Sequence, residues 1–527
     1  MNYSVSVAMD NQAASPSPSS RGRSALTLGI DLGTSGLKAI ALSADGVARG
    51  SARVAYTSLD PALSEAEQDP ALWLAAMARA IALLGQEVDL RRVAGVGLSG
   101  QTHGLVLVDE RGKAVAPCMT WADARCTVEA ADLREVVGDE VARRTGNVVL
   151  ESFTAPKMLW AMRHWPETRT ARLCLPKDFL RLALTGQWAT DPSDAASTLL
   201  FDLADQRWAS TLVQATGFEE RQLPPVQPSV SIAGSVTKDG AALSGLPEGT
   251  PVITGASDVA CAALGAGLVG PGTIYLNVGT AAQILTVAEP RPELTGRFVF
   301  QHCLPNLRLA AGTVYSAGLS LKWYLERMGS SGAVISAGPA TFRRADRLAS
   351  AVPPGARGLM FLPYLTGSSL PAPDPLARGA FVGLSTMHGT AECLRAILEG
   401  VGYGLRTALE SLEEGGPPAR RLVLGGGAAA SRLWPQILAG VLGRELSLLR
   451  RESSPVGAAL LGAIGVGMFR DVDQAIARSV SVKSTHEASP ETRNLYDRGY
   501  GEFARIDAGL RPVFPGLARL SGAEEAR

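Results

Sequence analysis

Short apolar runs separated by small polar turns make up the start of the chain. The segments 26–33 (LTLGIDLG), 37–43 (LKAIALS) and 51–58 (SARVAYTS) are each typical of a β-strand. The connections TSG and ADG supply glycines, which favour tight turns between paired strands. The pattern predicts an antiparallel meander of three strands.

A helix and a further strand are predicted after this meander. Residues 70–86 have helical spacing, and residues 91–100 (RRVAGVGLSG) return to a strand. This order differs from a simple repeat of βαβ units. The helix face that we expect to be buried carries Leu72, Ala76, Ala80 and Leu83.

A second passage repeats this pattern about 245 residues further on. Residues 272–289 (GTIYLNVGTAAQILTVAE) predict two strands joined by a Gly-Thr turn, and residues 420–443 predict a strand, a glycine turn and a helix. We therefore expect two related α/β domains that face each other, with a boundary near Val269–Gly272.

The length of 527 residues also indicates more than one domain. We expect an N-terminal domain at 25–270 and a C-terminal domain at 271–512, with a tail at 513–527. Residues 1–24 are polar and lack the apolar segment of a signal peptide, so we expect a disordered leader.

Charge and cysteine usage restrict the partners and the compartment. Lys plus Arg and Asp plus Glu number fifty each, which argues against a nucleic-acid binder or an electrostatic membrane anchor. The longest apolar stretch, Ala458–Met468, is too short to span a bilayer. Six scattered cysteines without a CxxC pair predict a reducing cytoplasm, with neither structural zinc nor a disulfide framework.

The best-known phosphate motifs do not account for this chain. There is no G-x-x-x-x-G-K-[ST] sequence, which excludes a Walker-type loop. Two G-x-G-x-x-G matches begin at Gly95 and Gly265, but neither has the strand-to-helix setting of a dinucleotide-binding fold.

The first predicted turn carries an acid and two hydroxyls. Asp31 ends a strand, and Gly33, Thr34 and Ser35 follow it with consecutive backbone N–H groups that can cradle a phosphate. An acid there would repel phosphate unless a cation intervenes, so we expect Asp31 to hold Mg²⁺ through water. Lys38 faces either solvent or phosphate. The alternative is a plain tight turn whose glycines supply positive φ.

Two further glycine turns lie in the second half of the chain. Gly279 and Thr280 repeat the first turn without an acid, so the two turns can hold a polyphosphate between them. Gly425, Gly426 and Gly427 close a strand and leave room for a flat ring or a phosphate. The alternative for this glycine run is a tight strand–helix turn.

Polar residues that can bind a hydroxyl-rich ligand follow three other strands. Asp258 stands after PVITG and before an alanine-rich helix, where it can be either a general base or only a helix N-cap. The other residues of this kind are Gln101, Thr102, His103, Trp121 and Asp123.

Taken together, these motifs resemble the FGGY family of carbohydrate kinases over residues 25–510. The segments that carry the resemblance are DLGTSGLK (31–38), GQTHG (100–104), WADAR (121–125), FTAPKMLW (153–160), LPKD (175–178), DPSDAA (191–196), GASD (255–258) and GAFVGLSTMHGTAECLRAILE (379–399).

The resemblance implies two domains of the actin/hexokinase (ribonuclease H-like) type, hinged over a central cleft, and a homodimer is plausible from the family. The implied reaction is ATP- and Mg²⁺-dependent phosphorylation of a ketopentose, with D-xylulose expected to give D-xylulose 5-phosphate. Asp258 matches the catalytic base, and Asp31 matches the acid near Mg²⁺ and the ATP phosphates. The implied sugar-side residues are Thr102, His103, Trp121 and Asp123, and the implied nucleotide-side residues are Gly279, Thr280, Gly425–Gly427 and Ser431.

Departures from the family pattern keep other substrates open. Ala122 replaces the usual Asn, Thr102 stands where Met is usual, and Ser368 and Ser369 interrupt a usual Gly-Glu-Arg-Thr-Pro segment. The alternatives are a kinase for another ketose or polyol of the family, and a non-catalytic sensor of sugar or nucleotide.

Overall fold

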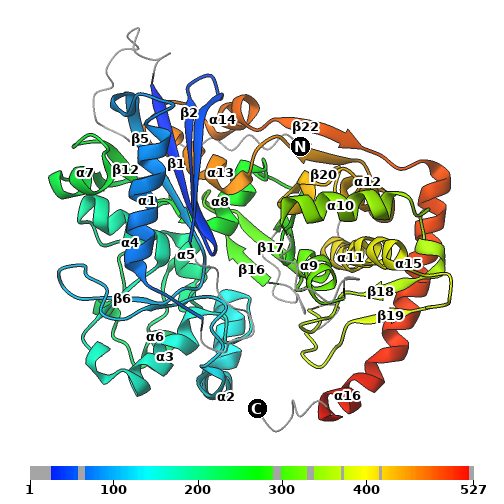
Figure 1. Ribbon diagram of the computed structural model, residues 1–527. Coiled ribbons are helices and arrows are strands. Elements are labelled where there is room, and N and C mark those ends of the chain that lie inside the picture. The colour runs from blue at the N-terminus through cyan, green and yellow to red at the C-terminus, as the bar shows by residue number, and fades with distance from the viewer. Residues whose placement is uncertain are drawn as a thin grey trace.

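A computed structural model describes residues 25–56, 66–288, 298–328, 338–369, 373–414 and 418–520. The predicted leader at 1–24 and the end of the strand predicted at 51–58 lie outside these residues. Two mixed sheets of seven strands each organise the two halves of the chain, and helices cover them (Figure 1). The prediction of a two-domain α/β fold is confirmed.

The first sheet contains the predicted meander. Neighbouring strands β1, β2 and β3 are antiparallel, and β5 returns parallel to β1 on its other side. Neither Gly33 nor Gly36 has a positive φ, so the expected conformational role of these turn glycines is wrong. A Cβ on Gly36 would instead lie 2.7 Å from the Val54 carbonyl oxygen. The strands of this sheet are β1 (Leu26–Gly33), β2 (Gly36–Ser43), β3 (Ala48–Ala55), β5 (Val93–Gly100), β11 (Ile232–Ser235), β12 (Pro251–Ile253) and β13 (Ala256–Ser257).

Helix α1 (Pro70–Leu84) covers one face of this sheet, and its predicted buried face is confirmed only in part, since Ala76 and Ala80 are buried. Leu72 is 49% exposed, whereas Trp73, Met77 and Ile81 are buried. Nearly every position of α1 is apolar, so the spacing does not single out one face. The bulkier side chains face the sheet because they bury more apolar area.

The second sheet repeats the arrangement of the first. A Gly-Thr turn joins β14 to β15, and β20 runs parallel to β14, as β5 does to β1. The glycine turn after β20 leads to α12, as predicted. The strands are β14 (Thr273–Val278), β15 (Ala282–Ala288), β16 (Phe298–Gln301), β17 (Arg308–Val314), β20 (Arg421–Gly425), β21 (Leu446–Leu449) and β22 (Val482–His486).

Two helices pack between the sheets. Helix α13 (Ser453–Gly465) follows β21 of the second sheet, yet it packs on β1 and β5 of the first sheet and on α8 (Asp258–Gly265) (Figure 1). A Cβ on Gly97 would overlap Ala458 of α13, and one on Gly265 would overlap Ser453. One glycine of each G-x-G-x-x-G match, Gly97 and Gly265, therefore serves close packing of backbones.

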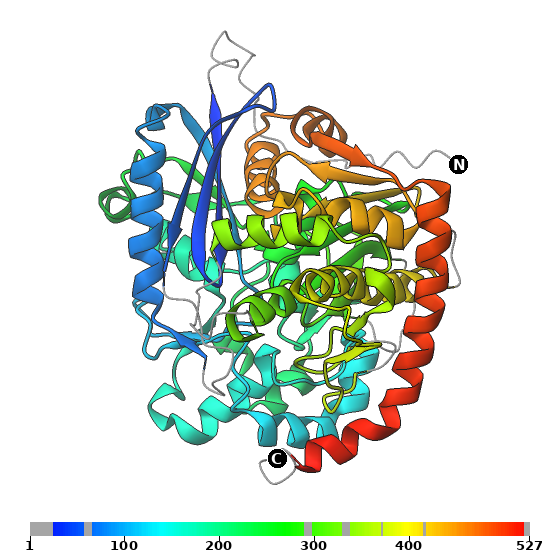
Figure 2. The ribbon, with the colours of Figure 1, turned by 45° about the vertical axis from the view of Figure 1, so that its right-hand side comes forward.

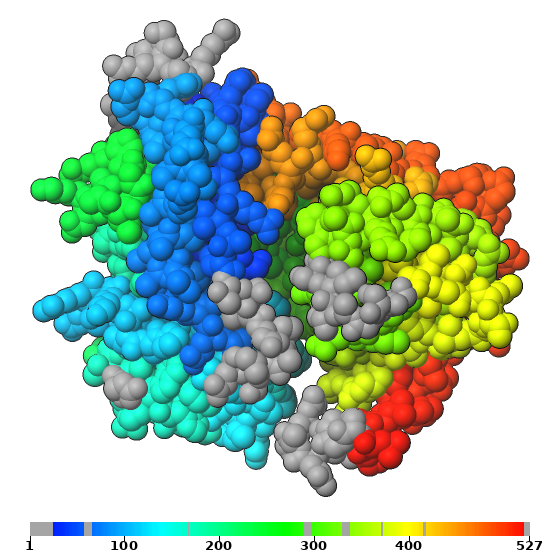
Figure 3. Space-filling model, in the orientation of Figure 1, coloured from blue at the N-terminus to red at the C-terminus, as the bar shows by residue number. Residues whose placement is uncertain are grey.

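The remaining elements surround these two sheets. Figure 2 shows α15 along the outer edge of the second half, and Figure 3 shows the surface hollowed between the two halves. The domain boundary near Val269–Gly272 stays a prediction. The remaining helices are α2 (Thr127–Thr145), α3 (Thr154–His164), α4 (Pro176–Thr185), α5 (Pro192–Ala196), α6 (Ser210–Ala215), α7 (Lys238–Ser244), α9 (Gly318–Trp323), α10 (Pro339–Ser350), α11 (Thr390–Glu413), α12 (Trp434–Leu442), α14 (Val472–Ser479), α15 (Pro490–Leu510) and α16 (Phe514–Leu520). The short strands are β4 (Glu67–Gln68), β6 (Val106–Val108), β7 (Cys118–Met119), β8 (Arg172–Cys174), β9 (Phe201–Asp202), β10 (Arg207–Trp208), β18 (Met360–Leu362) and β19 (Ala380–Val382).

Candidate active site

Asp31 lies buried near the end of β1, between polar side chains of both neighbouring strands. The strand registers place it opposite Lys38 of β2 and Ser99 of β5. The Ser99 hydroxyl donates to Asp31 Oδ1 at 2.9 Å, and Lys38 Nζ lies 3.9 Å from Oδ2. Burial raises the pKa of Asp31, although Lys38 and Ser99 oppose the shift. Lys38 also forms an ion pair with Glu452, at the start of α13.

Asp258 lies on the other side of β5, at the first turn of α8. Strand β13 pairs with β5 so that Ser257 stands beside Gly100, while Asp31 of β1 stands beside Ser99. Burial raises the pKa of Asp258 to about 7, and the negative charge of Asp31 adds to this shift. The two acids are therefore close enough to interact electrostatically.

The N-cap alternative for Asp258 is wrong. The N-cap of α8 is Ser257, whose Oγ accepts from the Ala260 N–H at 3.3 Å. Asp258 is the first residue of the helix, and its Oδ1 accepts from the Val259 N–H at 2.8 Å. The Asp258 carboxylate thus lies at the positive end of the helix.

A hydrogen-bond network joins the first turn to a predicted sugar-side residue. Trp121 Nε1 donates to Thr34 Oγ1 at 2.8 Å, and Thr34 Oγ1 lies 3.3 Å from Gln101 Oε1. Gln68 completes the network, since its side chain donates to the Thr34 carbonyl at 2.7 Å and accepts from Gln101 at 2.9 Å. Sequence reasoning missed Gln68; the only signal was its place before the Asp-Pro start of α1.

His103 is held in one orientation beside this network. Its backbone is left-handed, with φ 64°, and Lys157 Nζ donates to its carbonyl at 3.1 Å. His103 Nδ1 lies 2.8 Å from the Ser197 carbonyl oxygen, and the ring packs edge-on against Phe153. Burial lowers the pKa of His103 to about 3, so the ring is neutral. Because a carbonyl only accepts, Nδ1 carries the proton and Nε2 is an acceptor.

Asp123 and Thr102 differ from the other predicted sugar residues in accessibility. The Asp123 carboxylate is fully buried, accepting from the Ala66 N–H at 2.9 Å and from Arg125 Nη2 at 2.8 Å. These internal partners link Asp123 to Ala66 and Arg125 and hold the loop that carries Trp121, and the sugar contact implied for Asp123 stays a prediction. Thr102 is buried beside His103.

The predicted nucleotide turns are shaped mainly by internal packing. The carbonyl oxygens of Gly279 and Thr280 accept from the first turn of α9, at 2.9 and 3.0 Å. Gly426 has φ 78°, and a Cβ there would lie 2.7 Å from Asn277 Oδ1. A Cβ on Gly425 would overlap the Tyr275 hydroxyl, so the space at Gly425 is filled by protein rather than left for a ligand.

Ser431 and Ser35 contribute differently to their turns. The Ser431 hydroxyl donates to Asp346 at 3.0 Å and accepts from the Trp434 N–H at 2.9 Å, so it shapes the start of α12. Its hydroxyl has no proton left to donate to a nucleotide. Ser35 is exposed at the tip of the first turn.

Comparison with known proteins gives the class of this two-domain protein. Residues 26–265 match the N-terminal domain of the FGGY family of carbohydrate kinases, and residues 274–466 match its C-terminal domain. The chain therefore belongs to the FGGY family of carbohydrate kinases, and the resemblance drawn from the motifs is confirmed.

Several relatives are similar over nearly the whole chain. The xylulose kinase of Escherichia coli (strain K12) is 36% identical over 82% of this chain and 88% of its own length. The crystal structure of xylulose kinase from Rhodospirillum rubrum is 31% identical with a TM-score of 0.81, covering 93% of this chain and 99% of that one. The gluconokinase of Bacillus subtilis (strain 168) is 29% identical over 94% of this chain and 95% of its own length.

Proposed function

We propose that this chain transfers the γ-phosphoryl group of ATP to a hydroxyl of D-xylulose and yields D-xylulose 5-phosphate. The observation that carries the proposal is the pair of acids on the two sides of β5 in a carbohydrate kinase fold, Asp31, which is buried, and Asp258, which is half-buried. The xylulose kinases among the relatives support D-xylulose as the acceptor.

Asp258 is the proposed general base. A base that works near neutral pH is most effective when its pKa lies close to that pH, and the pKa of Asp258 is raised to about 7. The hydroxyl proton moves to the Asp258 carboxylate as the new O–P bond forms, and the bond from the γ-phosphorus to the ADP oxygen breaks. The N-terminus of α8 helps to keep part of the Asp258 population ionised.

The sugar is proposed to bind on the first domain. His103 Nε2 accepts a hydrogen bond from a sugar hydroxyl. Gln101 and the partly exposed Trp121 lie beside the same site, and both are hydrogen-bonded to Thr34. The hydrogen bond from Lys157 Nζ to the His103 carbonyl keeps the His103 backbone in its left-handed conformation. Thr102 lies next to His103 and is the residue we expect to influence which sugar fits.

The ATP phosphates are proposed to lie between the two hairpin turns. Gly33, Thr34 and Ser35 supply backbone donors from the first domain, and Thr280 supplies one from the second. Gly279 shapes the second turn, because its N–H donates to the Ala281 carbonyl at 2.9 Å. Lys38 adds a positive charge next to Asp31. Gly426 and Gly427 are the exposed glycines of the adenosine side.

Mg²⁺ fits this site through a single protein carboxylate. No group of three or more His, Cys, Asp or Glu residues suited to a metal ion occurs among the described residues. None is needed, because Mg²⁺ is usually held by one or two carboxylates, water and substrate phosphates. Asp31 would hold it through water, and the bound ion would neutralise part of the charge on the transferred group.

Two further features bear on the compartment of the enzyme. All six cysteines are free thiols, and most are buried. Among the described residues, no helix has both the length and the apolar character that crossing a membrane requires. We propose the cytoplasm as the compartment; a homodimer stays a prediction from the family.

The proposal is tested with purified Asp258→Asn and a coupled assay of ADP release. We expect kcat with D-xylulose to fall about 10²–10⁴-fold, because the hydroxyl proton loses its acceptor, while ATP still binds. In the wild type, kcat/KM should fall as the pH decreases through about 7, where Asp258 becomes protonated. Turnover near the wild-type value in Asp258→Asn would show that Asp258 is not the base.

Thermal unfolding of the same variant provides a control for folding. The pKa of Asp258 is raised on folding, so its protonated form stabilises the protein, and this stabilisation is lost as the pH rises through about 7. Asp258→Asn should therefore unfold at a higher temperature than the wild type at pH 8, with a smaller difference at pH 5. A destabilised variant at pH 8 would point to misfolding rather than to loss of the base.

The second candidate function is phosphorylation of another polyhydroxylated acceptor. Thr102 and Ala122 depart from the pattern of the xylulose kinases, and the gluconokinase relative shows that the family includes other substrates. A panel of ketoses, polyols and gluconate in the ADP-release assay decides between them. A sensor without catalytic activity would turn over no member of the panel.

A further inference from the structure

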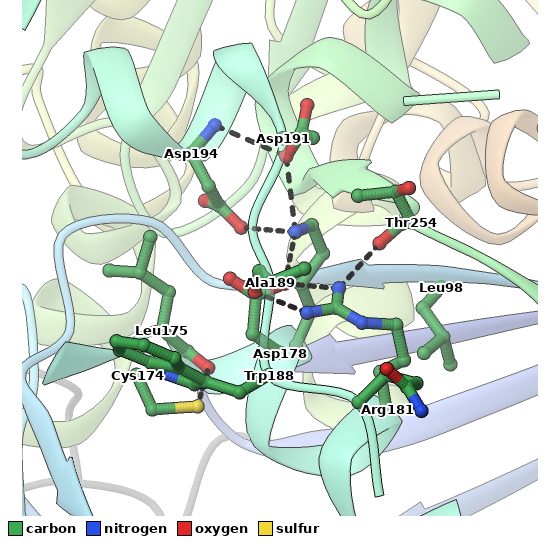
Figure 4. Close-up of polar contacts among 12 residues, drawn as sticks. Leu98, Cys174, Leu175, Asp178, Arg181, Trp188, Ala189, Asp191, Asp194 and Thr254 are labelled. Carbon is green, nitrogen blue, oxygen red and sulfur yellow. Dashed lines mark hydrogen bonds and ion pairs between the residues drawn. The ribbon is translucent and has the colours of Figure 1, made fainter. Parts of the chain in front are cut away.

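A group of five charged side chains is enclosed within the first domain, beneath the loop that leads to Asp258. Lys177, Asp178 and Arg181 belong to α4, and Asp191 and Asp194 belong to the start of α5; all five are fully buried (Figure 4). Burying ionised groups is costly unless they are well paired, and apolar residues often stabilise a core equally well. This group is therefore expected to have a role besides stability.

Lys177 is at the centre of the group. Its Nζ lies 2.6 Å from Asp178, 3.0 Å from Asp191 and 3.0 Å from Asp194. Arg181 pairs with Asp178 on the other side and donates from Nη1 to the Thr254 carbonyl at 2.8 Å. The charges thus connect α4 and α5 to the loop between β12 and β13.

Two cations face three carboxylates, and the group shifts the pKa values of Asp194 and Asp178 in opposite directions. Burial raises the pKa of Asp194 well above its ordinary value, and the neighbouring carboxylates of Asp191 and Asp178 add to this shift. Burial also acts on Asp178, but Lys177 and Arg181 outweigh it and hold that pKa low. Asp191 Oδ1 lies 3.0 Å from Lys177 Nζ, so Asp191 is an acceptor beside Lys177.

Asp191 connects to the catalytic helix through one hydroxyl. Ser193 Oγ donates to Asp191 Oδ2 at 2.6 Å and accepts from the Ser257 N–H at 2.9 Å. The direction of both bonds is fixed, because a backbone N–H can only donate and a carboxylate only accepts. Ser257 is the N-cap of α8 and directly precedes Asp258.

The backbone held in this way is a short segment that the Thr254 and Gly255 N–H groups also tie to the Ser231 and Ser229 carbonyls, at 2.8 and 3.0 Å, bonds that an alanine at position 229 would keep. Strand β13 contains only two residues, and Gly255 before it has φ 81° and a Cα packed so tightly on Leu98 that a Cβ would overlap the Leu98 carbonyl. The Arg181 bond to Thr254 and the Ser193 bond to Ser257 hold the two ends of this loop. Losing either bond leaves a buried polar group unpaired and frees the loop to shift.

We propose that Ser193, backed by Asp191 and Lys177, is a positioning residue that fixes the start of α8 and thereby the orientation of the Asp258 carboxylate. This inference rests on the proposed function, since it gives Ser193 an effect only if Asp258 takes part in catalysis. A shift of about 1 Å in a catalytic group can lower a rate about 10²-fold.

The chain offers a closely matched control in Ser229. The Ser229 hydroxyl donates to the same oxygen, Asp191 Oδ2, at 2.7 Å, but accepts no bond from the loop before Asp258. Ser193→Ala and Ser229→Ala therefore remove one donor each from Asp191, and only the first also removes the acceptor for the Ser257 N–H. Both serines are buried, so the loss of packing is similar.

The test compares kcat, KM and thermal unfolding of the two alanine variants, with ATP and the acceptor sugar that the wild type turns over. We expect Ser193→Ala to lower kcat about 10- to 100-fold while KM for ATP is unchanged, because the base is misplaced but the nucleotide site is intact. Ser229→Ala should keep a kcat close to the wild type. Ser193→Thr, which retains the hydroxyl, should recover most of the lost kcat.

Equal kcat values for Ser193→Ala and Ser229→Ala would overturn the inference, as would a Ser193→Ala defect that appears only in unfolding temperature. If Ser193→Ala does not fold, the same comparison is made with Ser193→Cys and Ser229→Cys, since a thiol is similar in size and a weak acceptor. Failure of the proposed function is distinguishable, because it requires Asp258→Asn to keep full turnover, whatever the serine variants do.

Discussion

The two halves of the molecule contain a similar hairpin at the corresponding place in their sheets. The position two residues before the turn glycine is an acid in the first hairpin and an amide in the second. Asp31 and Asn277 each stand two residues before the turn glycine, opposite a polar residue of the next strand and beside a parallel strand. Asp31 is an acid and is buried, with Ser99 and Lys38 as partners. Asn277 is neutral and leans against Gly426.

This difference teaches how a duplicated architecture can serve two roles. An acid in the first hairpin suits a metal ion and the transferred phosphoryl group, since it supplies a hard oxygen ligand. An amide in the second hairpin adds no negative charge where phosphates approach. The first half also carries the hydrogen bonds that join Thr34 to Gln101 and Trp121, and the second half has no counterpart of these at Thr280 among the described residues.

Replacing the acid of the first hairpin by the amide of the second should have the largest effect on activity. Asp31→Asn removes the proposed metal-side charge, so we expect kcat to fall about 100-fold or more and the Mg²⁺ concentration for half-maximal rate to rise. Titration of Mg²⁺ in the ADP-release assay measures both. The reverse change, Asn277→Asp, should mainly raise KM for ATP, because it adds a charge that repels phosphate. An unchanged Mg²⁺ dependence in Asp31→Asn would contradict the role of Asp31.

An intermediate effect is expected from the glycines of the second half. Gly426→Ala places a Cβ 2.7 Å from Asn277 Oδ1 at a backbone with φ 78°, so it should destabilise the protein by about 1–3 kcal/mol. Gly427→Ala is the matched control, since its Cβ would meet only the Val278 carbonyl oxygen at 3.8 Å. Chemical denaturation of both variants checks this, and equal stabilities would mean that the turn tolerates side chains at both positions.

The smallest effect is expected from losing the hydrogen bond that joins Trp121, on the proposed sugar side, to Thr34, on the proposed phosphate side. Trp121→Phe keeps an aromatic ring but removes the N–H that donates to Thr34 Oγ1 at 2.8 Å. The loss of one hydrogen bond of about 1 kcal/mol should raise KM for the sugar a few-fold, with little change in stability. Steady-state kinetics at saturating ATP measures it. A change in kcat alone would show that the bond acts on the phosphate turn and not on sugar binding.

Local pattern was enough to predict the strands, their glycine turns and the duplicated arrangement. Alternating apolar residues and turn glycines act over a few positions, so the meander at 26–55 and the hairpin at 273–288 follow from the sequence. The buried face of α1 followed only in part, because nearly all of its positions are apolar and only contact with the sheet selects Trp73 and Met77.

Site residues followed from the sequence only where a motif marked them. Asp31 and Asp258 stand out as acids at the ends of apolar strands, whereas Gln68 lies in no motif and Ser193 lies in the DPSDAA segment, which by itself indicates no role for its hydroxyl. Their roles depend on partners 34 and 64 positions away, as the hydrogen bonds to Thr34 and Ser257 show. The burial of Asp123 was not predictable for the same reason, since it depends on Arg125 and on the Ala66 backbone, 57 positions away.

The sequence by itself determined the elements, the order of the motifs and the family, because these depend on short-range pattern and on residue identity. Only the tertiary structure decided which residues meet. Pairing of β1 and β13 with opposite edges of β5 brings Asp31 and Asp258 together, although 227 positions separate them in the chain (258 − 31). Such a meeting depends on which strands pair and in which register, and that is chosen by the packing of the whole domain.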